Sequence, residues 1–308
     1  MNVREPVDID LPRLIQQFGS EEKCRAFMEA LRWPDGIECP RCKSEKVSRI
    51  KARPQFDCDS CRYQFSATAG TVFHDSHLPL WKWFLAVYIM CESKKGVSAL
   101  QLKRMLGTGY RTAWYLCHRI REAMANANRL DGKRNHKIIE VDDTQIQGEA
   151  QRWRPKPERI YVLGMVERHQ GRLRFEVVPN LSSETLEKAT KRHIGSNIWL
   201  IITDELAAYV NALAPTFKHR FRRIKHKQEY VRGDGVIHTN SIENAFSLLK
   251  RGIVGSWHHV SAKHLQRYLD EMSFRFSERR NPRLFSDTIT ELLSADPLTF
   301  KKLTSRAA

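Results

Sequence analysis

The sequence predicts a multi-domain α/β protein, and three features of its 308 residues support this prediction. Two Cys-x-x-Cys pairs near the N-terminus indicate a small module built around a metal ion. Residues 78–128 carry apolar side chains at helical spacing throughout. From residue 136 onward, apolar runs of strand length alternate with helical patterns, which is typical of an α/β domain.

The charge balance of the chain is strongly basic. It has 52 Lys and Arg residues against 35 Asp and Glu residues, which gives a formal net charge of +17. Such an excess favours a polyanionic partner, most simply nucleic acid, whose phosphates attract Lys and Arg whatever the sequence. A basic, well-hydrated surface is the alternative.

We expect a cytoplasmic protein, nucleoid-associated when bound to DNA, with no membrane partner. The N-terminus lacks the basic and then apolar run of an export signal. The most apolar stretch, residues 78–91, is too short to span a bilayer and contains Lys82. In a reducing compartment the seven cysteines should be thiols or metal ligands instead of disulfides.

Residues 1–36 are expected to form an N-terminal helical segment, and residues 37–75 contain the metal module. Two residues between a pair of thiols let both reach one ion, so two such pairs complete a tetrahedral shell. One structural Zn²⁺ is the best match, although iron could occupy the same geometry. Because the shell is closed, the metal would stabilise the fold and take no part in catalysis. The ligands would be Cys39, Cys42, Cys58 and Cys61.

Basic residues of this metal module are candidate DNA contacts. Arg49 and Lys51 lie between the two cysteine pairs. They would present a positive surface to the phosphate backbone, unless they are only solvated surface charge.

Residues 76–130 are expected to form a helical DNA-binding region. A helix over residues 98–106 ends at Gly107, and a second helix, rich in Arg and Tyr, begins near Tyr110. Two short helices around a glycine-containing turn are typical of a helix-turn-helix. A helical hairpin that binds nothing is the alternative. Candidate groove contacts are Arg111, Tyr115, His118 and Arg119.

A domain boundary is expected at residues 130–136, and a second domain follows over 136–275. Helices beginning at Asn240 and Ser261 should close this domain. The tail, residues 276–308, has helical patterns without recognisable chemistry. Four apolar runs are expected to be strands: residues 138–141, 160–166, 173–178 and 198–203.

Three acidic residues lie at the ends of these elements. Asp142 and Asp204 follow the first and fourth apolar runs, and Glu243 lies near the start of a helix. Taken singly, they are explained by a turn, an N-cap and a capping box with Asn240, respectively. Together they lie where α/β sheets gather their sites, and converging carboxylates need cations such as Mg²⁺ or Mn²⁺. Strand alternation alone leaves open whether Asp142 or Asp143 belongs to the group.

A series of short motifs runs in order through residues 20–275. They are Cys-Pro-x-Cys (39–42), Cys-x-x-Cys-Arg-Tyr-Gln-Phe-Ser (58–66), Thr-Ala-Gly-Thr-Val-Phe (68–73), Gly-Val-Ser-Ala-Leu-Gln-Leu (96–102), Thr-Ala-Trp (112–114), Glu-Val-Asp (140–142), Thr-Asp (203–204), His-Thr-Asn-Ser-Ile-Glu (238–243) and Leu-Leu-Lys-Arg (248–251). In these motifs the chain resembles bacterial insertion-sequence DDE transposases with an N-terminal zinc ribbon, relatives of the eukaryotic Merlin elements.

The resemblance implies an RNase H-like catalytic domain over residues 136–275, with a mixed sheet. It places the catalytic acids at Asp142, Asp204 and Glu243, which would hold two Mg²⁺ or Mn²⁺ ions. It implies cleavage at the ends of an insertion sequence and transfer of the freed 3′-OH into target DNA. A homodimer or larger assembly is expected, because two terminal repeats must be brought together.

Further basic residues of this domain are candidate DNA contacts. Arg222 and Arg223 belong to a basic run that could follow the phosphate backbone, or could be a solvated strand face. Lys250 and Arg251, in the last turn of the helix of Glu243, could bind the element end or only complement the helix dipole. The main rival function is an inactive or domesticated copy that binds DNA without cutting it. A nuclease that cuts without joining is a weaker rival.

Overall fold

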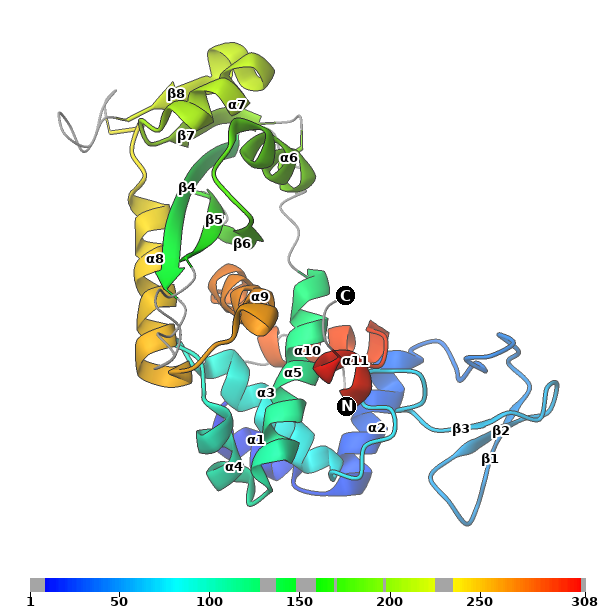
Figure 1. Ribbon diagram of the computed structural model, residues 1–308. Helices are drawn as coiled ribbons and strands as arrows, with labels where there is room; N and C mark the ends of the chain where they lie inside the picture. The colour runs from blue at the N-terminus through cyan, green and yellow to red at the C-terminus, as the bar shows by residue number, and fades with distance from the viewer. Residues whose placement is uncertain are drawn as a thin grey trace. The chain divides into compact units, whose positions relative to one another are not determined.

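The structure is a computed structural model that describes residues 9–127, 137–147, 159–168, 171–195, 198–224 and 235–305. The chain forms two compact units, Met1–Asn126 with Arg280–Ala308, and Ala127–Arg279 (Figure 1). The expected boundary at 130–136 lies outside the described residues. Within the described ranges, none of the helices has both the length and the apolar character needed to cross a membrane.

The first unit is mainly helical. The expected C-terminal signal at Gly107 is confirmed, since Gly107 ends α4 in the left-handed region at φ 58°. The Ser20 hydroxyl caps α2 by accepting from the N–H of Lys23 at 3.3 Å. The three cysteines outside the metal module, Cys24, Cys91 and Cys117, are buried, as their apolar helical surroundings predict. The helices are α1 (Leu11–Phe18), α2 (Glu21–Arg32), α3 (Leu80–Glu92), α4 (Ala99–Leu106), α5 (Tyr110–Ala127), α10 (Leu284–Ser294) and α11 (Phe300–Thr304).

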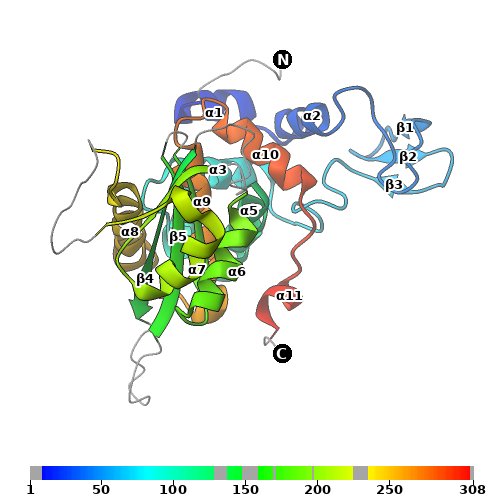
Figure 2. The ribbon, with the colours of Figure 1, turned by 90° about the horizontal axis from the view of Figure 1, so that it is seen from above.

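The tail completes the core of this unit. Helix α10 packs beside α2 and α3 (Figure 2). The ring of Phe285 in α10 lies 5.7 Å from that of Phe18 and 5.6 Å from that of Phe84, centroid to centroid. The N–H of Val72 donates to the carbonyl of Leu292 at 3.2 Å. The C-terminal segment is therefore structural, because its apolar rings close a core that the N-terminal helices leave open.

The cysteine module is a three-stranded antiparallel sheet of order β1-β2-β3, with β1 at Val47–Arg49, β2 at Phe56–Cys58 and β3 at Gln64–Phe65. Its apolar content is small: the ring of Trp33, at the end of α2, packs on Phe56 and Phe65 at 5.6 and 5.8 Å. A module with so few buried apolar side chains is of the kind that a bound metal ion stabilises.

The second unit contains a five-stranded mixed sheet of order β6-β5-β4-β7-β8. Strands β4, β5 and β6 are antiparallel to one another, whereas β7 runs parallel to β4 and β8 parallel to β7. This is the mixed sheet expected of an RNase H-like domain. The strands are β4 (Lys137–Gln147), β5 (Arg159–Glu167), β6 (Arg172–Val178), β7 (Ile198–Thr203) and β8 (Phe221–Arg223).

Helices cover both faces of this sheet. On one face, α6 (Ser183–His193) and α7 (Ala207–Phe217) pack on Ile139 and Val141 of β4. On the other, α8 (Asn240–Gly252) and α9 (Ala262–Glu278) pack on β5 and β6 (Figure 1). Four apolar runs are confirmed as strands, but β4 extends to Gln147, and the short edge strand β8 lies outside these four runs.

Candidate active site and metal centre

Asp142 lies inside β4 and not at its end, which corrects the sequence analysis. The parallel partner β7 pairs with β4 only as far as Glu140, opposite Ile202, whereas β5 continues alongside to Gln147. Asp142 therefore lies where β4 has just lost one of its two neighbours, and Asp204 follows the end of that neighbour. The two carboxylates belong to the same edge of the parallel pair, which is where such sheets place their sites.

Residues 142 and 143 face opposite sides of the sheet. Asp143 lies on the side of α6 and α7, where the Tyr209 hydroxyl donates to its Oδ1 at 3.0 Å. Asp142 shares the other side with Glu140, whose carboxylate contacts the start of α8. Because Glu243 comes from α8, Asp142 is the aspartate on its side of the sheet.

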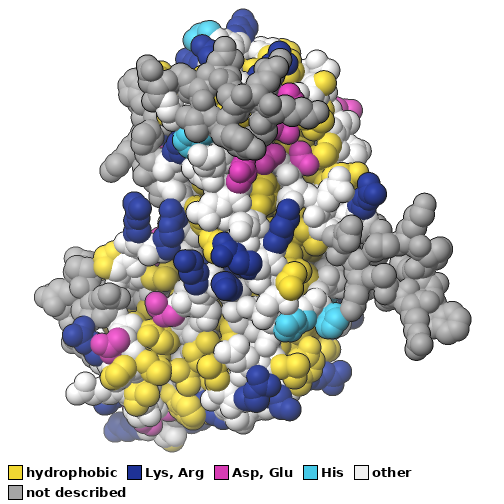
Figure 3. Space-filling model, turned by 90° about the vertical axis from the view of Figure 1, so that its left-hand side faces the viewer, with side chains coloured by type: hydrophobic (Ala, Val, Ile, Leu, Met, Phe, Trp, Pro, Cys, Tyr) yellow, Lys and Arg dark blue, Asp and Glu magenta, His cyan; other side chains and the backbone are white. Residues whose placement is uncertain are grey.

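The Asp142 carboxyl is crowded by other acids. Burial raises its pKa to about 7; the N–H of Asp143 opposes this rise, whereas the charges of Asp204, Asp143 and Glu243 add to it. The acids therefore lie within electrostatic range of one another, and a cation between them would relieve the repulsion. Acidic side chains gather on the side of the molecule that carries α8 (Figure 3).

The acids form an open arrangement. Within the described part of the chain, the four thiols of the zinc ribbon are the one set of three or more potential ligands that lie within 4.8 Å of one another. The carboxylates of the acids are more widely spaced; Glu243 is exposed and Asp204 half-buried. Mg²⁺ commonly takes one or two protein carboxylates and completes its shell with water and substrate phosphates. An open group of acids fits a metal site of that kind.

Helix α8 begins without the expected capping box. Thr239 is the N-cap, and its hydroxyl donates to Oε1 of Glu243 at 2.9 Å. The N–H groups of Ser241 and Ile242 donate to Oε2 of the buried Glu140, at 2.8 and 2.9 Å. A side chain from β4 thus satisfies donors that an N-cap residue would usually satisfy.

Arg168, which follows β5, pairs with the same Glu140. Its Nε donates to Glu140 Oε1 at 2.5 Å, and its terminal nitrogens donate to the carbonyls of Val236 and His238, at 2.5 and 2.7 Å. Burial and the charge of Arg168 lower the pKa of His238, against the opposing influence of Glu140 and Glu243. The sequence analysis assigned no role to Glu140 or Arg168; the available signal was Glu140, two positions before Asp142 and therefore on the same face.

Asp204 lies in the turn from β7 to α7. Its Oδ1 accepts from the N–H of Leu206 at 3.1 Å, and Leu206 is itself the N-cap of α7. Asp204 is therefore not the helix cap that its position suggested. The bond to Leu206 uses one oxygen and fixes the orientation of the carboxylate in the turn.

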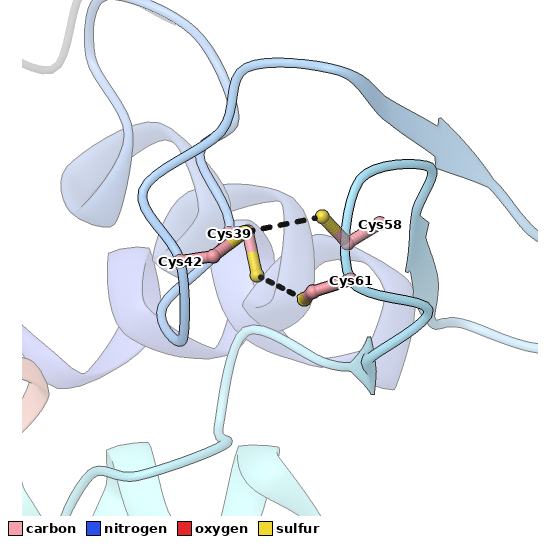
Figure 4. Close-up of side chains that lie close together, drawn as sticks. All are labelled: Cys39, Cys42, Cys58 and Cys61. Carbon is pink, nitrogen blue, oxygen red and sulfur yellow. Dashed lines mark hydrogen bonds between the residues drawn. The ribbon is translucent and has the colours of Figure 1, made fainter.

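The four cysteines of the zinc ribbon converge (Figure 4). The Sγ atoms of Cys39 and Cys61 lie 3.7 Å apart, and those of Cys42 and Cys58 lie 3.5 Å apart. Zn–S bonds of about 2.3 Å place tetrahedral sulfurs about 3.8 Å apart, so these thiols fit a Zn²⁺ ion. Burial raises the pKa of Cys61 to about 12, whereas at Cys39 the N–H groups of Cys42 and Arg41 outweigh burial and lower the pKa to about 7, which favours the thiolate at that ligand.

Two known domain families match the chain. Residues 19–64 match the transposase zinc-ribbon domain, and residues 129–277 match the ISXO2-like transposase domain. The chain belongs to the zinc-ribbon insertion-sequence transposases. It is 28% identical over 292 residues to the "Uncharacterized protein in transposable element ISH50" of Halobacterium salinarum, strain ATCC 700922 / JCM 11081 / NRC-1, over 87% of this chain and 95% of that protein.

The structure of this transposase corrects part of the expected DNA-contact surface on α5. Arg119 is buried, and its guanidinium donates to the carbonyls of Val72 and His74. His118 is also buried, and the Tyr115 hydroxyl donates to a carbonyl in the segment between α10 and α11. The middle of α5 is a core element of its unit, so these three side chains do not face a groove.

Other candidate contacts of the transposase are exposed. Arg111 lies in the first turn of α5, with its guanidinium 5.0 Å from the ring of Phe300. Arg49 is paired with Glu29 at 2.6 Å, which reduces its availability, whereas Lys51 is exposed in the neighbouring turn. The candidates of the second unit, Arg222, Arg223, Lys250 and Arg251, are all exposed.

Proposed function

We propose that this transposase is active, and that Asp142, Asp204 and Glu243 hold two Mg²⁺ or Mn²⁺ ions for cleavage at the ends of its element and for strand transfer. The placement of the acids supports this proposal most directly: Asp142 and Asp204 lie at the same edge of the parallel pair, and Glu243 comes from the helix that covers the face of Asp142. Burial is the main cause of the raised pKa of Asp142, and the charges of Asp204 and Glu243 add to it. Carboxylates that disfavour one another's ionisation fit a cation site. The basic chain around them fits a DNA substrate.

The chain's residues would share the work of holding this site. Asp142 lies in a paired strand and is the most firmly fixed of the acids. Glu243 is oriented by the Thr239 hydroxyl, and Asp204 by the N–H of Leu206. When bound, the ions would neutralise charge on the scissile phosphate and lower the pKa of the attacking oxygen nucleophile.

The reaction would proceed by two phosphodiester exchanges. Water attacks the phosphodiester at the element end, one P–O bond forms as another breaks, and the leaving strand keeps a 3′-OH. That hydroxyl then attacks a phosphodiester of the target, again with one P–O bond formed and one broken. Because each step conserves the number of P–O bonds, joining requires no nucleotide cofactor.

Exposed basic residues would hold the DNA, and the zinc ribbon would supply a separately folded surface for the element ends. A homodimer or larger assembly would bring two terminal repeats together. The proposed DNA contacts are Arg49, Lys51, Arg111, Arg222, Arg223, Lys250 and Arg251.

A joining assay tests the proposal even while the sequence of the terminal repeats is undefined. The substrate is a supercoiled plasmid that carries the gene with its native flanking DNA, incubated with Mg²⁺ and a second target plasmid. Wild-type protein should yield joined products with new junctions at the flanks, identified by sequencing. Asp142→Asn and Glu243→Gln should each abolish these junctions while still shifting DNA in a gel.

A matched control separates the site from general effects of charge. Glu184→Gln removes an acid from α6 whose side chain is 74% exposed, and it should leave joining unchanged. Cleaved DNA without junctions would favour the nuclease. If the wild type binds DNA but neither cuts nor joins it, the binding-only rival is correct and the proposal fails.

A further inference from the structure

We infer that Glu140 and Arg168 position the third acid, by fastening the start of α8 to β4 so that Glu243 faces Asp142. This inference rests on the proposed function. Neither residue is assigned a contact with metal or DNA; both act through α8. They are therefore positioning residues.

The first part of the argument is the unusual cap of α8. Glu140 is fully buried, and its Oε2 accepts both N–H groups from the second and third residues of the helix, Ser241 and Ile242. A carboxylate at a helix N-terminus also interacts favourably with the helix dipole. Because Glu140 belongs to β4, this cap attaches the helix to the strand that carries Asp142.

Arg168 holds the segment that leads into the helix. It donates to the carbonyls of Val236 and His238 with its terminal nitrogens and to Glu140 with Nε. The side chains of Arg168 and Glu140 are 13% and 0% exposed, so each charge is compensated mainly by the groups around it. Val236 also packs on the apolar cluster at the edge of β4 and β7. The approach to α8 is thus held by both polar and apolar contacts.

Only a few covalent and hydrogen bonds separate Glu140 from the Glu243 carboxylate. Ile242, whose N–H Glu140 accepts, directly precedes Glu243 in the chain, and the Thr239 hydroxyl donates to the Glu243 carboxylate. On the strand side, Glu140 lies two residues before Asp142 on the same face. A displacement of about 1 Å in such a constellation can lower the rate about 100-fold. A pair that fixes the two acids relative to each other therefore has a direct effect on the site.

The opposite charges of the pair provide a sharp test. Removing the negative charge with Glu140→Gln would weaken cation binding by charge alone. Removing the positive charge with Arg168→Gln would strengthen it by charge alone. If instead the pair positions α8, both substitutions weaken Mn²⁺ binding, by about 10- to 100-fold. The sign of the Arg168→Gln effect therefore distinguishes positioning from electrostatics.

The experiment uses the full, zinc-loaded protein. Mn²⁺ binding is measured by electron paramagnetic resonance, with Asp142→Asn defining the signal from the acids. Thermal unfolding and the Mg²⁺ concentration for half-maximal joining are measured on the same samples. The control is Arg174→Gln, which breaks another partly buried ion pair of this unit: Arg174 of β6 lies 2.9 Å from Asp270 of α9, with side chains 15% and 7% exposed.

Positioning predicts that Arg168→Gln and Glu140→Gln raise the Mg²⁺ requirement and weaken Mn²⁺ binding, whereas Arg174→Gln lowers thermal stability alone. The inference is overturned if Arg168→Gln binds Mn²⁺ as tightly as the wild type, or more tightly. If Glu140→Gln does not fold, Arg168→Gln decides alone, because it leaves the Glu140 cap of α8 in place. Failure of the proposed function is recognised separately: Asp142→Asn would then bind Mn²⁺ like the wild type.

Discussion

Gly164 sets how closely α8 approaches the sheet, and Gly164→Ala tests whether that approach matters for activity. Gly164 lies in β5 directly opposite Asp142. A Cβ there would lie 2.6 Å from Cδ1 of Ile242 and 2.7 Å from Cζ of Phe246, both in α8. Carbon contacts are favourable at about 3.5–4.0 Å, so these atoms must move away by roughly 1 Å.

The expected consequence is a displaced Glu243. Overpacking of this kind costs about 1–3 kcal/mol of stability, and a 1 Å misplacement of a catalytic group costs about 100-fold in rate. We therefore expect Gly164→Ala to fold, to unfold at a lower temperature, and to join DNA about 100-fold more slowly at saturating Mg²⁺. The measurements are thermal unfolding and the single-turnover rate of joining.

Gly195→Ala is the matched control, because a Cβ at that glycine meets nothing within 4 Å. It should leave both the rate and the unfolding temperature near those of the wild type. The reasoning is refuted if Gly164→Ala joins DNA at the wild-type rate, since α8 would then accommodate the methyl group without moving the acid.

Three further predictions concern the metal centre, the acids and the DNA surface. Cys42→Ser should reduce bound zinc from about one ion per chain to none, measured by elemental analysis, because a four-thiolate shell loses a ligand. Burial raises the pKa of Asp142 to about 7, so between about pH 4 and 7 the folded protein holds a proton that the unfolded chain has already lost. The free energy of unfolding of the metal-free protein should therefore fall as the pH rises from about 4 to 7. In Asp142→Asn the unfolding temperature should depend less on pH than in the wild type. A variant with the pH dependence of the wild type would contradict the prediction. Arg119→Ala should destabilise the first unit by about 1–3 kcal/mol, because it leaves the buried carbonyl of Val72 without its donor. Arg111→Ala should instead reduce the salt dependence of DNA binding by about one ion without changing stability.

Apolar runs predicted most strands of the second unit, and β5 and β7 in particular are buried along most of their length. Strand β7 spans the same residues as the run at 198–203. The second half of β4 is different: Asp143 to Gln147 is mostly polar, and pairing with β5 holds it as a strand. Strand β8 is three residues long and pairs with the end of β7. The second half of β4 and strand β8 each depend on pairing with a strand elsewhere in the sequence, and a local residue pattern does not show such pairing.

The same limit applies to the site. Alternation places Asp142 and Asp143 on opposite faces, but the choice between them depends on which face α8 covers. Glu140 accepts from Ser241, 101 residues away, and Arg168 donates to Val236, 68 residues away, so neither bond leaves a local signature. Arg119 was misassigned because Arg on a helix is usually exposed, and the carbonyls it binds lie in an earlier loop.

The core shared by Phe18, Phe84 and Phe285 has a consequence for synthesis of the chain. The second unit, Ala127–Arg279, is translated between the two parts of the first unit. At about 5–20 residues per second, on the order of ten seconds or more separate the emergence of α5 from that of α10. During this time the rings of Phe18 and Phe84 lack their partner. The unit that begins first on the ribosome is therefore the last to be completed, and a message truncated before Arg280 would yield a complete second unit joined to a first unit with an open core.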